Sequence, residues 1–242
     1  MKKSDAIISF ISVFLPMIVS LPLIASTNIF LSGTGYELVF LSIGFIIIFM
    51  CNNKTIRAPI NLKKLNFKLL SYIFFISLLS YISVTCIIYI AKFLKIGDCS
   101  IVDSTTELNA LSIIAIIIIG PICEEIFFRV AILGALLKKF SKHIAILIQG
   151  IIFAFIHCFS FTSVTFYIVL VGGFSLGYIY YYTHNILSSI ICHAMYNAIT
   201  MLPFDFILNT INTSIFIGSI FLEVISLILI VYLIKKIKCL SV

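Results

Sequence analysis

The sequence predicts an all-α, polytopic membrane protein built as a bundle of about eight transmembrane helices. Hydrophobic residues make up 62% of the 242 residues and charged residues only 10%, whereas a soluble domain is about 45–50% apolar and about 25% charged. The apolar residues also gather in successive runs, several of them close to the roughly 20 residues that a helix needs to cross a bilayer. We therefore expect residues 1–242 to form a single transmembrane domain without a separate soluble domain.

The first four expected helices are divided by a small-residue turn and by charged loops. They run from about Ala6 to Leu31, Leu38 to Met50, Leu69 to Leu94 and Asn109 to Leu137. We interpret Ser32-Gly33-Thr34-Gly35 as the turn before the second helix. A basic stretch precedes the third helix and an acidic loop around residues 98–107 follows it. Pro121 lies inside the fourth helix, where it removes a backbone N–H donor, so we expect a kink or a new helix start there.

The last four expected helices are separated by short polar or charged segments. They run from about Ile144 to Phe159, Phe161 to Tyr182, Ile186 to Leu202 and Ser214 to Ile234. Lysines separate the fourth helix from the fifth, Pro203 follows the seventh, and lysines close the eighth. Gly173 and Gly177 have the GxxxG spacing that lets helices approach closely, and we expect them to serve packing only.

The charges in the loops predict the orientation of the chain in the membrane. Basic clusters lie at the N-terminus, after the second and fourth helices and at the C-terminus, and the loop after the third helix is acidic on balance. The positive-inside rule then places both termini in the cytoplasm, and we expect a bacterial cell membrane. The same rule accounts for the net charge of +7, so we expect the lipid bilayer and no nucleic acid as a partner. The sequence indicates no oligomeric state.

Three charges stand inside the apolar fourth helix, in the stretch Glu124-Glu125-x-x-x-Arg129. A charged residue at the centre of a membrane helix costs about 2.5–3.5 kcal/mol, so these groups must be paired or face a polar interior. Glu125 and Arg129 are four residues apart and share a helix face, with the acidic residue on the favourable N-terminal side. Glu124 points about 100° away and is left free of this pair. A purely structural ion pair is the alternative interpretation.

Two later helices carry further polar residues in apolar surroundings. His157 is the lone ionisable side chain near the end of the fifth helix, and His193 and Asn197 are four residues apart on the seventh. A carboxylate and an imidazole can activate water, and a second imidazole with an amide can stabilise an oxyanion, so the set supports hydrolysis. Packing and hydrogen bonding alone are the structural alternative. Glu223, in the eighth helix, receives no role.

A metal-dependent version of the same site is the competing chemistry. Zn²⁺ is bound by histidine and by carboxylates, so Glu124, His157 and His193 would be its candidate ligands. The sequence has no HExxH motif, the usual signature of a zinc site on one helix. We therefore expect no required cofactor.

These residues give the chain its resemblance to a known family. Glu124-Glu125-x-x-x-Arg129, Phe153-x-x-x-His157 and His193-x-x-x-Asn197 resemble the three motifs, in order, of the CAAX prenyl endopeptidase type II and bacteriocin-processing family of intramembrane proteases, called CPBP or Abi. The motifs fall in a core of about residues 109–203. The remaining helices carry no motif of that family.

The resemblance implies a fold of about eight helices that encloses a polar cavity within the membrane. It also implies an intramembrane endopeptidase of the glutamate type, in which Glu124 and His157 activate water, His193 and Asn197 form the oxyanion site, and Glu125 and Arg129 support them. The substrate would be a membrane-associated peptide or protein of the CAAX, leader, pheromone or bacteriocin-related kind. A non-catalytic bacteriocin-immunity or scaffold protein of the same fold is the alternative, followed by a small transporter with these groups as a proton relay.

Overall fold

The fold was analysed in a computed structural model of the chain. It describes residues 3–26, 29–51, 62, 64–96, 110–158, 163–201 and 212–240, and for residues 3–10, 29–31 and 51 it describes the backbone only. The expected acidic loop at residues 98–107 and Pro203 therefore lie outside the described residues.

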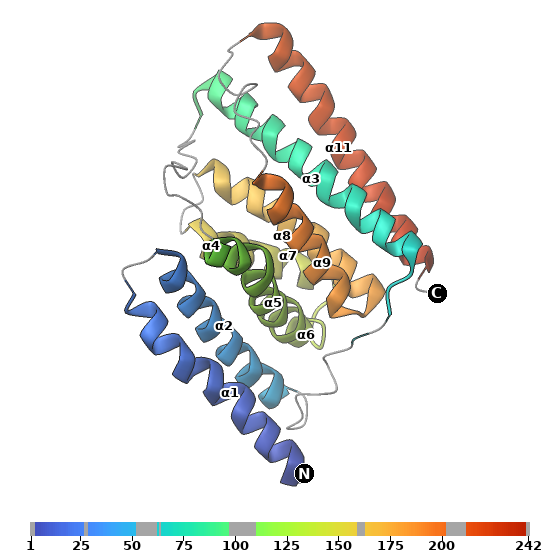
Figure 1. Cartoon of the computed structure of the whole chain (residues 1–242). Helices are drawn as coiled ribbons and strands as arrows, with labels where there is room; N and C mark the ends of the chain where they lie inside the picture. The colour runs from blue at the N-terminus through green and yellow to red at the C-terminus, as the bar shows by residue number, and fades with distance from the viewer. Residues whose placement is uncertain are drawn as a thin grey trace.

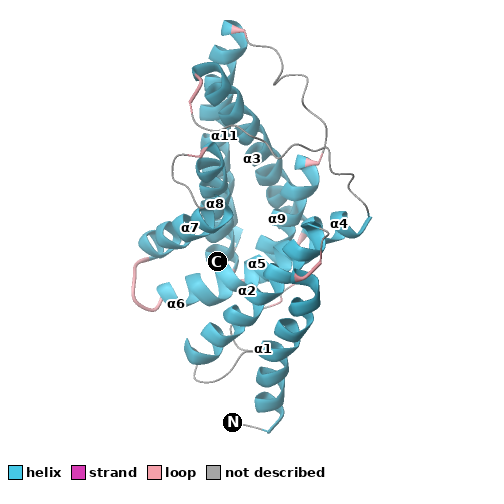
Figure 2. Ribbon diagram, turned by 90° about the vertical axis from the view of Figure 1, so that its left-hand side faces the viewer, coloured by secondary structure: helices cyan, strands magenta, loops and turns pink. Residues whose placement is uncertain are grey.

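Helices are the only regular secondary structure of the described residues, and they form pairs around a central group (Figure 1). The helices are α1 (Lys3–Ile24), α2 (Ile29–Cys51), α3 (Phe67–Leu94), α4 (Ala110–Ile114), α5 (Gly120–Glu125), α6 (Gly134–Leu136), α7 (Lys142–Cys158), α8 (Val164–Thr183), α9 (Ile186–Thr200) and α11 (Thr213–Leu240). The pair α1–α2 lies on one side, the pair α3–α11 on the other, and α4 to α9 lie between them. Figure 2 shows the same arrangement from the side.

The all-α, polytopic fold class is confirmed, since the described chain has eight helices when α4 to α6 are taken as one. Five of them are long and apolar enough to cross a membrane: 32–50, 67–94, 110–136, 164–183 and 213–240. The other three apolar helices, at 11–24, 142–158 and 186–200, are shorter. That these three also cross the bilayer stays a prediction, as do the cytoplasmic termini.

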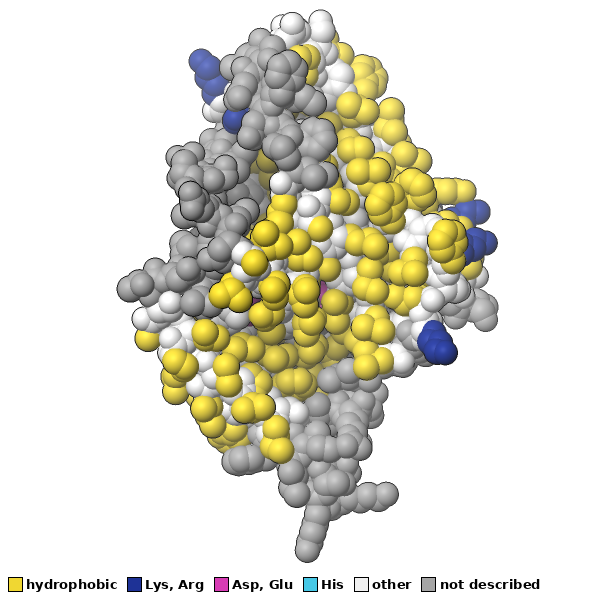
Figure 3. Space-filling model, in the orientation of Figure 1, with side chains coloured by type: hydrophobic (Ala, Val, Ile, Leu, Met, Phe, Trp, Pro, Cys, Tyr) yellow, Lys and Arg dark blue, Asp and Glu magenta, His cyan; other side chains and the backbone are white. Residues whose placement is uncertain are grey.

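The outer surface has the character that a lipid-facing protein needs. In the face shown in Figure 3 the described surface is largely hydrophobic, and lysine and arginine side chains stand only at its edges. Exposed large side chains on α11 include Phe221, Ile228 and Val231. In water such a surface would promote aggregation, whereas in the hydrocarbon of a bilayer it is surrounded by apolar lipid. The chain is therefore an integral membrane protein.

The boundary between the first two helices differs from the prediction. The first helix ends at Ile24 and α2 begins at Ile29, so the expected turn at residues 32–35 lies inside α2. Within this segment, Gly35 serves helix packing. A Cβ atom added at Gly35 would stand 2.7 Å from both Cγ1 and the backbone nitrogen of Ile24, so only glycine allows α1 and α2 to approach this closely. Because α2 begins earlier than expected, Glu37 lies inside a membrane helix and not in the expected loop.

The fourth expected helix is continuous, and π-helical turns accommodate its proline. Two π-helical stretches, η1 (Ala115–Ile119) and η2 (Ile126–Leu133), flank the segment α5 that carries Glu124 and Glu125. Pro121 stands in the first turn of α5, where a missing N–H is tolerated. The expected new start therefore takes the form of a change in helix type, and π-helical turns of this kind often mark functional sites.

Close packing holds the next two helices, α7 and α8, against each other. A Cβ atom added at Gly173 would lie 3.2 Å from Cδ1 of Phe153, and one added at Gly177 would lie 3.1 Å from Oε1 of Gln149. The packing role expected for the GxxxG pair is confirmed, because both glycines admit α7 side chains against α8. This contact fixes the position of Phe153, one turn before His157.

Candidate active site

A cavity of about 270 Å³ lies among α3, α5, α7, α8 and α9. Its polar lining consists of Ser77, Ser80, Glu124, His157, Ser175, Cys192, His193, Tyr196 and Asn197. Four of the six predicted site residues are therefore brought together around one space, from three separate helices. The other two, Glu125 and Arg129, are fully buried beside it.

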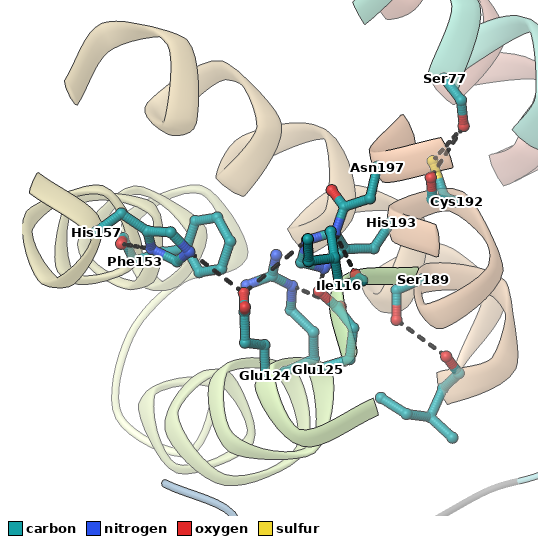
Figure 4. Close-up of polar contacts among 12 residues, drawn as sticks. Ser77, Ile116, Glu124, Glu125, Phe153, His157, Ser189, Cys192, His193 and Asn197 are labelled. Carbon is teal, nitrogen blue, oxygen red and sulfur yellow. Dashed lines mark hydrogen bonds and ion pairs between the residues drawn. The ribbon is translucent and has the colours of Figure 1, made fainter. Parts of the chain in front are cut away.

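Glu124 and His157 face each other across this cavity (Figure 4). Nε2 of His157 lies 3.4 Å from Oε2 of Glu124, and Nδ1 lies 2.7 Å from the carbonyl oxygen of Phe153. A carbonyl oxygen can only accept a hydrogen bond, so Nδ1 carries the proton and donates. This bond fixes the ring and presents Nε2 to Glu124.

His193 approaches the same carboxylate oxygen from α9. Its Nε2 lies 3.9 Å from Oε2 of Glu124, while Nδ1 lies 3.0 Å from Oε1 of Glu125. The Glu125 carboxylate accepts from Nδ1–H and holds the ring with Nε2 directed at the cavity. Both histidines are thus fixed through Nδ1 and converge through Nε2 on Glu124, which makes Oε2 of Glu124 the centre of the site.

The predicted ion pair between Glu125 and Arg129 is present. Nε of Arg129 lies 3.0 Å from Oε2 of Glu125, and both side chains have no exposed surface. The guanidinium carbon also stands 4.7 Å from the ring centre of Phe153, a distance at which a cation is attracted to an aromatic face. Glu125 therefore joins Arg129 to His193. As expected, Glu124 remains outside this pair.

Asn197 has a second contact that the sequence did not reveal. Its Nδ2 donates a hydrogen bond of 2.9 Å to the carbonyl oxygen of Ile116. The N–H of Gly120 bonds to Ala115, so in this π-helical register the donor for Ile116 would come from residue 121, which is proline. Asn197 fills the place of the missing donor. One of its two N–H groups is thereby used, and the other remains for a ligand.

Sequence analysis missed one acidic residue at the site. Glu37 of α2 lies close enough to Glu124 for the two carboxyl groups to interact electrostatically, and its Oε2 atom is shielded from solvent. The signal was present, because Glu37 is the lone formally charged side chain in the apolar stretch Ile29–Cys51. It was overlooked because the second helix was expected to begin at Leu38. Glu223 lies elsewhere and accepts a hydrogen bond of 3.0 Å from Ser83 of α3.

The metal alternative was compared with the geometry of the acidic, histidine and cysteine side chains. Within the described ranges, no group of three or more of these side chains is arranged to hold a metal ion. The set Glu124, His157 and His193 thus lacks a ready ligand geometry, and no step is derived through a metal.

Comparison with known proteins matches the part of the chain that carries this site. Residues 106–199 match the family described as type II CAAX prenyl endopeptidase Rce1-like. This segment contains all three motifs and the whole predicted set of site residues. The motif-bearing core is thus similar to the type II CAAX prenyl endopeptidase Rce1-like family. The match agrees with the resemblance expected from the motifs.

The chain is also similar to a protein of Bacillus subtilis (strain 168) with the name "Putative membrane peptidase YdiL". It is 36% identical over 92 residues, which cover 38% of this chain and 36% of the relative. The similarity to this relative therefore spans about a third of its length. No solved structure matches the chain.

Proposed function

We propose that the protein is an intramembrane endopeptidase that hydrolyses a peptide bond of a membrane-associated peptide or protein. The observation that carries this proposal is the convergence of two oriented imidazoles on Oε2 of Glu124 inside a cavity within the helix bundle. The names of the matched family and of the Bacillus subtilis relative support a peptidase.

In the proposed reaction, a water molecule between Glu124 and His157 attacks the carbonyl carbon of the scissile bond. Glu124 takes a proton from this water as the new C–O bond forms. His193, protonated on both ring nitrogens, and the unused N–H of Asn197 donate hydrogen bonds to the oxyanion. The C–N bond then breaks, and the proton held by Glu124 passes to the leaving amine.

Glu125 and Arg129 act on this chemistry through His193. An imidazolium is needed for Nε2 of His193 to donate, because a neutral ring that donates through Nδ1 can only accept at Nε2. The carboxylate of Glu125, 3.0 Å from Nδ1, stabilises that cation and fixes its orientation. Arg129 holds Glu125 in turn. The candidate substrates are CAAX-type, leader, pheromone and bacteriocin-related peptides.

The test compares the small peptides of cells that express wild-type protein, Glu124→Ala or His157→Ala at equal membrane levels. We expect a cleaved peptide that is present with wild type and absent with both variants. Glu223→Gln, which alters an acidic residue on α11 away from this cavity, is the matched control and should retain cleavage. An unchanged peptide profile with Glu124→Ala would refute the proposal and favour the non-catalytic scaffold.

Metal dependence is tested separately with purified protein. We expect cleavage of the peptide found in cells to survive exhaustive chelation, with metal analysis on the same sample. Activity that disappears with chelation and returns with Zn²⁺ would instead assign Glu124, His157 and His193 as metal ligands.

A further inference from the structure

A second polar cavity, of about 250 Å³, lies at one end of the helix bundle and shares no lining residue with the candidate active site. It is bounded by the beginning of α3, the junction of α8 and α9, and the C-terminal end of α11 (Figure 1). Three of the helices long enough to cross a membrane begin or end here, at Phe67, Thr183 and Leu240. The cavity therefore lies at the level where the hydrocarbon of a bilayer meets the lipid headgroups.

Part of the lining of this cavity offers hydrogen-bond donors and positive charge. Its polar side chains include Lys64 and Asn66 before α3, and Tyr182 and His184 at the end of α8. The ammonium group of Lys64 has three N–H donors and no acceptor. The side-chain oxygen of Asn66 already accepts from the backbone N–H of Leu69, so its N–H₂ group is the part that it can offer to a ligand. These groups suit a ligand that accepts hydrogen bonds.

No acidic side chain offsets this positive charge within the described residues. None of the described side chains that line the cavity is acidic, and neither Lys64 nor His184 forms an ion pair with a described acidic residue. A further ammonium group, that of Lys142, stands 5.6 Å from the ring centre of Tyr182. Two helices begin and two end at the cavity, so their dipoles largely cancel and the side chains set the charge. The ligand should therefore be an anion.

Another part of the lining is apolar and belongs to the hydrophobic core between α3 and α11. Ile237 is fully buried in this core, and Leu69 packs against it. A free inorganic anion gains nothing from such a surface, whereas a molecule with an anionic head and hydrocarbon chains can use both parts of the lining. Anionic phospholipids have this chemistry, basic pockets between membrane helices bind their headgroups, and the bilayer supplies them at the level of the cavity.

We propose that this cavity binds the phosphate group of an anionic phospholipid, with Lys64 as its main cation. The phosphate oxygens accept charge-assisted hydrogen bonds from Lys64 and Asn66, and the glycerol end of the hydrocarbon chains lies against Leu69 and Ile237. Phosphatidylglycerol represents this class, because its headgroup carries one negative charge and no cation. In phosphatidylcholine the choline cancels the charge of the phosphate. The site is independent of the endopeptidase proposal.

Lipid binding is measured by native mass spectrometry of the purified full chain in detergent micelles, titrated with phosphatidylglycerol or phosphatidylcholine. We expect the first phosphatidylglycerol to bind wild type at least about 5-fold more tightly than the first phosphatidylcholine, the effect of one favourable charge near the membrane surface. Lys64→Gln should lower the affinity for phosphatidylglycerol by about 5-fold for the same reason. Lys64→Arg keeps the charge and should bind as wild type does.

Lys235→Gln is the matched control for a built site against general surface charge. It removes the same charge from the last turns of α11, at the same end of the bundle, but Lys235 does not line the cavity. This variant should bind phosphatidylglycerol as tightly as wild type. Equal losses in Lys64→Gln and Lys235→Gln would overturn the site, and so would unchanged binding in Lys64→Gln or equal affinity of wild type for the two lipids.

Competition with inorganic phosphate at constant ionic strength distinguishes a lipid from a free anion. We expect phosphatidylglycerol to stay bound to wild type, because inorganic phosphate makes no use of the apolar contact with Leu69 and Ile237. Displacement of the lipid by inorganic phosphate would assign the cavity to a free phosphate ion and refute the lipid. Bound phosphatidylglycerol should also raise the temperature at which wild type unfolds in micelles, and an equal rise in Lys64→Gln would contradict the site.

Discussion

Replacing Glu125 by leucine should strongly destabilise the protein, because the change leaves Arg129 buried without its partner. Both side chains are fully buried, and Glu125 bonds to Arg129 and to His193 at 3.0 Å each. Breaking a buried ion pair from one side costs about 3–5 kcal/mol. The second change Arg129→Met removes the uncompensated charge, so the double variant should lose less stability than the two single variants together.

The assay is unfolding in mixed micelles with increasing sodium dodecyl sulfate, applied to wild type, both single variants and the double variant. We expect an interaction free energy of about 2–3 kcal/mol, the upper range for residues in direct contact. Glu223→Leu is the control, since loss of the single hydrogen bond from Ser83 should cost about 1 kcal/mol. Additive losses for Glu125 and Arg129 would refute the buried, mutually dependent pair.

Two further predictions test how the helices are packed and bonded. Gly35→Leu should lower the unfolding free energy by about 1–3 kcal/mol, because its Cβ would meet Ile24 at 2.7 Å, whereas Gly33→Leu, with nothing within 4 Å, should be nearly neutral. Equal effects of these two changes would contradict the close contact of α1 and α2. Pro121→Ala should supply the N–H that Ile116 lacks, so Asn197→Ala should cost about 1 kcal/mol less stability in the Pro121→Ala background. An unchanged cost in the unfolding assay would show that Asn197 does not replace the missing donor.

Most of the helices could be predicted because an apolar run in a membrane has only one way to satisfy its backbone. Every N–H and C=O must be bonded within the segment, so a long apolar run becomes a helix. The third helix was expected at 69–94 and is found at 67–94, and the sixth, expected at 161–182, is found at 164–183. The π-helical turns around α5 were not predictable, because hydrophobicity does not distinguish a π-helical turn from an α-helical one.

The partners of the site residues were predicted only where they are local in sequence. The bond between Glu125 and Arg129 was predicted from their spacing on one helix. The hydrogen bond from His157 to the carbonyl oxygen of Phe153 is equally local but was not predicted. The bond from His193 to Glu125 joins residues 68 positions apart, and the bond from Asn197 to Ile116 joins residues 81 apart. Helical periodicity carries no information about such pairs.

Glu37 shows how a boundary error becomes a functional one. A pair of glycines reads as a turn in sequence because glycine adopts turn conformations readily, yet in a membrane glycine equally often marks the contact of two helices. At residues 32–35 the glycines belong to a helix and Gly35 marks the contact with α1. The helix α2 is therefore about two turns longer at its start than expected. Those turns carry Glu37 to the level of Glu124 on another helix. The cost of an ionisable group in such a helix is then a reason to count Glu37 among the candidate site residues.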